Sequence, residues 1–124
     1  MRIIIAGGRD FKDLDYLTDK VALTVSNLDQ DDIQIISGAA RGADRMGELF
    51  AIDHKYPIRQ FRANWELHGK SAGYKRNVQM AEYADALIAF WDGQSKGTGH
   101  MIDIARSKGL KVRVYSYPVE STPF

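Results

Sequence analysis

The sequence predicts an α/β fold, a doubly wound (Rossmann-like) parallel five-stranded sheet with helices on both faces. Three features of the 124 residues predict it. Five short apolar or β-rich runs alternate with four segments whose apolar residues recur at helical spacing, which is typical of a parallel sheet with crossover helices. Two of the runs, residues 3–6 and 86–91, are apolar throughout and therefore suit the centre of the sheet. Glycine-rich turns follow three of the runs, as expected where a strand ends near a ligand.

The expected elements follow one another along the chain as one domain. The second helix is expected to follow Asp44 and to stop near Pro57, and Gly109 is placed as the residue just after a helix end. In the third helix we expect Tyr74, Val78 and Ala81 to share one face. The expected strands are residues 3–6, 33–36, 58–61, 86–91 and 111–115, the expected helices are residues 13–28, 45–56, 74–83 and 98–108, the expected polar loop is residues 62–73, and the tail after about residue 116 is expected to be irregular.

Strand composition also predicts the strand order 3-2-1-4-5. The third and fifth runs contain charged residues such as Arg59 and Arg113, which suit the edges of a sheet. This order places strands one and four side by side, where the carboxyl ends of parallel strands open a ligand-binding crevice. The turns after Ala6, Ile36 and Trp91 are expected to converge there.

The turn after residues 86–91 is expected to hold an anion. Gly93 and Gly97 let the backbone approach a ligand, and Thr98 is expected to open the next helix, whose free N–H groups favour a phosphate. Asp92 could orient a ribose hydroxyl, and Ser95 lies in the same turn. An ordinary loop between strand and helix is an equal alternative for this turn alone. Neither the G-x-G-x-x-G dinucleotide fingerprint nor the P-loop spacing fits the chain.

Composition narrows the class of protein. The net charge is +1 with no basic stripe, so nucleic-acid binding is not expected. The chain has no cysteine, and no apolar run is long enough for a signal peptide or a membrane span, so we expect a soluble cytoplasmic protein without membrane association. The three histidines lack metal-ligand spacing, and no metal site is expected.

Four motifs stand in order along the chain: Gly7-Gly8-Arg9, Ser37-Gly38-x-Ala40-x-Gly42-x-Asp44, Ala72-Gly73-x-x-Arg76-Asn77 and Gly97-Thr98. Together they resemble the SLOG superfamily of Rossmann-like proteins, and within it the small bacterial and phage YspA-type domains. The superfamily also includes the single-stranded-DNA-binding recombination mediator DprA and the phosphoribohydrolases of the LOG type. The resemblance implies a ligand derived from a nucleotide and a role as a sensor or ligand-binding module.

Residue chemistry and this resemblance together select the candidate site. Arg9, Arg41 and Arg76 could clamp phosphate, although Arg9 could instead pair with Asp10 in solvent. Asn77 could read a base or ribose. The full predicted ligand-binding set is Gly7, Gly8, Arg9, Ser37, Gly38, Arg41, Gly42, Arg76, Asn77, Asp92, Gly93, Ser95, Gly97 and Thr98.

For two further residues, a structural role is the favoured interpretation. Asp44 is expected to be only a first-turn residue that complements the helix dipole. Trp65 could stack on a base, but capping the core is the favoured interpretation.

The resemblance is weakest at the catalytic position. LOG-type enzymes carry a glutamate three residues after the Gly-Thr motif, and here that residue is Met101, whose thioether cannot transfer a proton. We therefore predict no catalytic residue and a non-catalytic nucleotide-binding module. Two alternatives stay open: a LOG-like phosphoribohydrolase that uses substitute residues such as Asp92 or His100, and DprA-like binding of single-stranded nucleic acid. A homodimer is a further expectation, because related domains often pair through helices.

Overall fold

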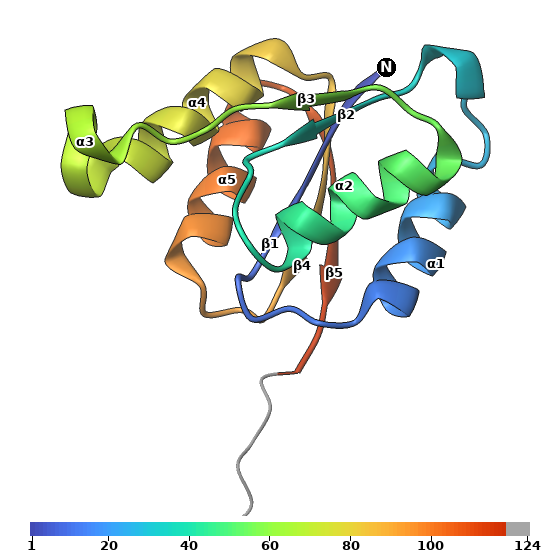
Figure 1. The fold of residues 1–124 in the computed structure, drawn as a ribbon, viewed down its shortest axis with the longest axis horizontal. Coiled ribbons are helices and arrows are strands. Elements are labelled where there is room, and N and C mark those ends of the chain that lie inside the picture. The colour runs from blue at the N-terminus through green and yellow to red at the C-terminus, as the bar shows by residue number, and fades with distance from the viewer. Residues whose placement is uncertain (119–124) are drawn as a thin grey trace, which may run out of the picture.

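The structure is a computed structural model that describes residues 1–118. Its centre is a parallel sheet in the order β3-β2-β1-β4-β5, which confirms the predicted fold class and strand order (Figure 1). The predicted irregular tail lies outside the described residues from 119 onward, and Ser116 still belongs to the last strand. The strands are β1 (Arg2–Gly7), β2 (Gln34–Ser37), β3 (Ile58–Gln60), β4 (Ala86–Trp91) and β5 (Lys111–Ser116).

Helices cover both faces of the sheet, with α1 and α2 on one face and α4 and α5 on the other (Figure 1). The short α3 lies beside the start of α4. Within residues 1–118, no helix is long and apolar enough to cross a membrane. The helices are α1 (Leu14–Val25), α2 (Ala43–His54), α3 (Trp65–His68), α4 (Ala72–Tyr83) and α5 (Lys96–Ser107), with 3₁₀ turns η1 (Gln30–Asp32) and η2 (Gly69–Ser71).

The apolar composition of β1 and β4 follows from burial on both faces. Ile3 and Ile5 pack under α1 and α2, whereas Ile4 and Ala6 pack under α4 and α5. Each β1 side chain therefore meets a core, whichever way it points. Burying one such isoleucine contributes about 1.5–3 kcal/mol, which fixes the strand in the centre. The register pairs Gly7 with Phe90, so the turns after β1 and β4 leave the sheet at the same level.

The start of α5 and the expected polar loop differ from the sequence prediction. Helix α5 begins at Lys96 with Ser95 as its N-cap, so Thr98 lies in the first turn and does not open the helix. The expected polar loop contains α3, because the Asn64 side chain accepts a hydrogen bond from the backbone N–H of Leu67 at 3.0 Å and caps this turn.

The buried face of α4 also differs from the prediction. Tyr74 is 43% exposed, whereas Met80, Ala81 and the polar Asn77 are buried. Asn77 can occupy the interior because its amide is satisfied there by neighbouring groups. Apolar spacing therefore placed Ala81 correctly in the interior but was wrong for Tyr74.

Candidate functional site

A cavity of about 520 Å³ opens at the carboxyl ends of β1 and β4. The three predicted turns converge on it, and α3 and α4 close its remaining side. Its volume lies in the range usual for small-molecule sites. The cavity lies between β1 and β4, from which the chain crosses over in opposite directions, and ligands bind at such a point in doubly wound sheets. The predicted residues that line it are Gly7, Gly8, Arg9, Arg76, Asn77, Asp92, Ser95, Gly97 and Thr98.

The first turn of α5 forms one wall of this cavity. Asp92 Oδ1 accepts hydrogen bonds from the backbone N–H groups of Gln94 and Ser95, both at 2.8 Å, and these bonds lower the pKa of the Asp92 carboxyl. The Ser95 side chain makes no capping hydrogen bond to the helix. The first N–H groups of a helix have no intrahelical acceptor, so this turn offers free donors to an anion. A Cβ at Gly97 would meet no atom within 4 Å, which leaves the backbone accessible.

Asn77 ties α4 to this turn. Its Nδ2 donates to the carbonyl oxygen of Gly97 at 3.2 Å and lies 3.2 Å from Nδ1 of His100. Its Oδ1 accepts from Nε of Arg76 at 3.1 Å. Asn77 lines the cavity, but its side-chain oxygen and an amide hydrogen are already used in bonds to Arg76 and Gly97, so the geometry gives it a positioning role for the α5 turn and for Arg76.

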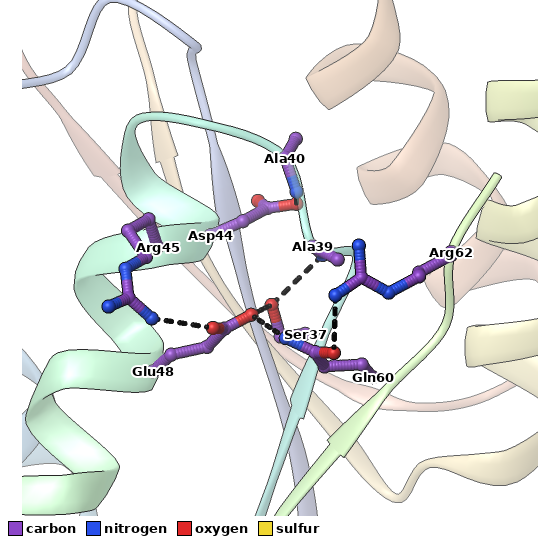
Figure 2. Close-up of polar contacts among 8 residues, drawn as sticks. All are labelled: Ser37, Ala39, Ala40, Asp44, Arg45, Glu48, Gln60 and Arg62. Carbon is purple, nitrogen blue, oxygen red and sulfur yellow. Dashed lines mark hydrogen bonds and ion pairs between the residues drawn. The ribbon is translucent and has the colours of Figure 1, made fainter.

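Arg76 and Asp44 form a partly buried charged pair of residues under the loop after β2. Arg76 Nη1 donates to the carbonyl oxygen of Gly38 at 2.5 Å. Asp44 Oδ2 accepts from the backbone N–H of Ala40 at 3.3 Å (Figure 2). Burial raises the pKa of Asp44 to about 6, although the Arg76 charge and the Ala40 N–H oppose the rise. Burial also lowers the pKa of Arg76, an effect that Asp44 opposes and the neighbouring Arg9 charge reinforces.

Trp65 stands at the cavity wall and does not cap the core as expected. It begins the short α3, outside the two cores, and is 51% exposed. The guanidinium carbon of Arg9 lies 5.8 Å from the centroid of its ring, within cation–π range. The alternative pairing of Arg9 with Asp10 is not what the structure shows, because Asp10 lies 3.9 Å from Arg41 in an ion pair whose side chains are largely in solvent.

Ser37 turns toward α2. Its hydroxyl donates to Glu48 Oε2 at 2.6 Å and accepts from the backbone N–H of Ala39 at 3.0 Å (Figure 2). Gln60 and Arg45 also donate to the same carboxylate. Burial raises the pKa of Glu48, but these hydrogen bonds outweigh it and hold the pKa below its usual value. Ser37 is completely buried and does not line the cavity, so its role is to fix the loop after β2.

The remaining predicted residues shape loops or lie beside the cavity. Gly42 has φ of +79°, and a Cβ there would lie 2.3 Å from the Gly8 oxygen, so the loop after β2 can pack on the turn after β1 only with glycine. Gly93 adopts φ of +82° in the turn before α5. Gly38 and Arg41 line a second cavity of about 420 Å³.

Several lining residues escaped the sequence prediction. Asp44, Lys70, Tyr74 and Met101 all line the first cavity. Asp44 could have been found, since it ends the Ser37 motif, but its burial depends on how α2 packs. Within residues 1–118, no group of three or more acidic or histidine side chains is arranged to hold a metal ion.

Comparisons with known proteins identify a family, a relative and a similar fold. A family model described as "YspA, cpYpsA-related SLOG family" matches residues 1–68. The Gene 61 protein of Mycobacterium phage D29 is 34% identical over 121 residues, which covers 90% of this chain and 93% of that protein. The crystal structure of DNA processing protein A (DprA) from Streptococcus pneumoniae is similar with a TM-score of 0.71 at 15% identity over 91% of this chain. This chain spans 49% of the DprA chain, and at that identity the likeness concerns the fold alone.

Proposed function

The chain belongs to the YspA, cpYpsA-related SLOG family, and on that premise we propose that it binds a nucleotide or nucleotide derivative in the cavity between β1 and β4. One observation carries the proposal. The uncapped first turn of α5 and the side chains of Arg9 and Arg76 all border the same cavity. Backbone donors at a helix start and guanidinium groups are the usual protein partners of phosphate.

The phosphate fits best against residues 96–98. Gly97 leaves that backbone open, and Arg9 and Arg76 supply positive charge from the neighbouring wall. The partial burial of Arg76 strengthens its attraction for an anion, because water screens a buried charge less. The phosphate would also reduce the repulsion between the two guanidinium groups.

The base has aromatic partners on the opposite side of the phosphate turn. Trp65 and Tyr74 line the cavity and are both about half exposed, so each ring presents surface to a flat heterocycle. Arg9 lies near the Trp65 ring and His100 packs against Tyr74, so the heterocycle stacks on the surface that these neighbours leave open. Stacking of a base on an aromatic side chain contributes about 1–3 kcal/mol. We assign the base to this side and leave its identity to experiment.

A second candidate function, hydrolysis of a nucleoside monophosphate, is favoured by Asp44. A buried carboxyl with a pKa near 6 in a cleft has the properties of a general acid. Against it, Met101 occupies the position of the LOG-type glutamate and its thioether lines the cavity. Binding without cleavage is therefore the function that we propose, with Asp44 as the residue on which any cleavage would depend.

Calorimetric titration tests the proposal with a panel of nucleoside monophosphates, ADP-ribose and NAD. In parallel, the purified protein is denatured and any released small molecule is identified by mass spectrometry. We expect saturable binding of at least one nucleotide or a released nucleotide derivative. A protein that releases no nucleotide and binds no member of the panel would contradict the proposal.

A further inference from the structure

A second cavity of about 420 Å³ adjoins the first. The two share a wall made of Arg9, Ala40, Trp65 and Arg76. The second cavity extends from this wall along the loops that follow β2 and β3, away from the phosphate turn of α5. A ligand seated in the first cavity can therefore continue past Trp65 into the second.

The two cavities differ in charge. Asp10, Asp44 and Asp92 line the first and offset its cations. The second is bordered by four arginines, at positions 9, 41, 62 and 76, and in the part of the chain that the structure describes no acidic side chain lines it. Such a concentration of one sign of charge in a concave surface attracts an anionic group.

The two arginines that belong to the second cavity alone are available to a ligand. Arg62 is exposed, and among residues 1–118 its Nη2 donates only to the neutral Gln60 side chain, at 3.1 Å (Figure 2). Arg41 faces Asp10 across 3.9 Å, with both side chains largely in solvent. Solvated pairs of this kind are weak, so a phosphate can take the place of Asp10 at little cost.

From this arrangement we infer that the second cavity is a subsite for a second phosphate, and that the ligand is a dinucleotide or a comparable molecule with two phosphate-bearing units. The inference rests on the proposed nucleotide site in the first cavity. One nucleotide occupies the first cavity, and the chain of the ligand passes Trp65 into the second. Arg62 and Arg41 then bind the second phosphate.

Calorimetry with matched ligands tests this inference. The four nucleoside 5′-monophosphates are titrated first, and the one that binds is compared with the 5′-phosphorylated dinucleotide and pentanucleotide of the same base. The variant is Arg62→Gln, which removes a cation that supports neither core. Arg106→Gln is the control, because it removes an exposed arginine at the far end of α5, outside both cavities.

We expect the dinucleotide to bind about tenfold more tightly than the monophosphate, the gain expected for one charge-assisted phosphate contact. In Arg62→Gln this gain is lost while monophosphate affinity stays unchanged, and Arg106→Gln behaves like the parent. Equal affinity for monophosphate and dinucleotide, or a gain that survives Arg62→Gln, would overturn the second subsite and leave the proposed function standing. Failure of every ligand to bind would overturn the second subsite, and the panel with ADP-ribose and NAD decides the proposed function separately. An affinity that keeps rising to the pentanucleotide and falls steeply with salt would replace the inference with single-strand nucleic-acid binding.

Discussion

Asp44 and Arg76 meet at the bare α-carbon of Gly38: a Cβ at that position would stand 2.7 Å from Asp44 Oδ2 and 2.8 Å from Arg76 Nη1. No side chain larger than a hydrogen fits between the two charged groups without displacing one of them. The loop after β2 thus holds a carboxyl group and a guanidinium group together at the junction of the two cavities. Because the Asp44 carboxyl is buried beside Arg76, its charge affects the stability of the protein as well as ligand binding.

Replacing Asp44 by Asn should change how stability depends on pH. Burial raises the pKa of Asp44 from 3.8 to about 6. The folded protein then keeps a proton that the unfolded chain has released, so the stability that this group contributes is complete below about pH 4 and is lost as the pH rises through about 6. The variant lacks this titration. We expect its unfolding free energy relative to the parent to rise by roughly 2–3 kcal/mol between about pH 4 and about pH 7.

Urea unfolding of the parent and of Asp44→Asn at the two pH values measures this difference. The other titratable groups are the same in both proteins, so their contributions to the pH dependence cancel. A relative stability that is the same at both pH values, or that falls toward neutral pH, would show that the Asp44 carboxyl is not desolvated as the structure indicates.

Ser37→Ala should lower stability and leave binding intact. The Ser37 hydroxyl donates to the buried Glu48 carboxylate at 2.6 Å, and loss of a hydrogen bond to a charged group costs about 1.5–3 kcal/mol. Ser107→Ala is the matched control, because its hydroxyl bonds an exposed helix carbonyl and its loss should cost less than about 0.5 kcal/mol. Urea unfolding and nucleotide titration of both variants check this. Weakened nucleotide binding in a fully folded Ser37→Ala would restore Ser37 to the ligand site.

Arg9→Gln should weaken nucleotide binding without loss of fold. Arg9 lines both cavities and is exposed, so its charge is available to phosphate and supports neither core. Losing one charge-assisted bond costs about 1.5–3 kcal/mol, or about ten- to a hundredfold in affinity. Calorimetry on this variant beside Arg106→Gln separates a local contact from a change in net charge. Equal losses in both variants would mean that Arg9 makes no specific contact.

The protein should not release free base from nucleoside monophosphates. Met101 lines the cavity, and the sequence resemblance predicts that it stands where LOG-type enzymes carry a glutamate. The absence of a positioned acid or base typically costs ~10²- to 10⁴-fold in rate. Incubation with AMP followed by chromatography for adenine checks this against a buffer blank. Steady adenine release that disappears in Asp44→Asn would instead establish an enzyme with Asp44 as its acid.

The sheet could be predicted because the composition of each strand reflects how much of that strand is buried. Residues 86–91 contain only apolar side chains, as a strand covered on both faces requires, and Arg59 and Arg113 occur where solvent reaches an edge. Turns at the ends of adjacent parallel strands then meet at one edge of the sheet, so the place of the cavity followed from the order of the strands.

The side-chain partners within the site could not be predicted in the same way. The Ser37 hydroxyl could serve a ligand or a buried carboxylate, and only the packing of α2 brings Glu48 to it. The spacing of apolar residues predicted that Tyr74 faces the core. Instead Asn77 occupies the interior, because its side-chain amide finds a hydrogen-bond partner there. Arg62 was not predicted as a site residue. It lines the same cavity as Arg41 only because of the path that the loop after β3 takes.

Gly97→Val tests the nucleotide site most directly. The position lies in the first turn of α5 and a Cβ there meets no protein atom within 4 Å, so valine should fold normally while its side chain fills the space before the free N–H groups. Calorimetric titration compares the parent, Gly97→Ala and Gly97→Val with the tightest nucleotide of the panel, after thermal unfolding has shown that all three are folded. We predict an intermediate affinity for Gly97→Ala and a loss of at least about a hundredfold for Gly97→Val, equivalent to about 2.7 kcal/mol. A folded Gly97→Val that binds the nucleotide as tightly as the parent would place the phosphate elsewhere and contradict the proposed site.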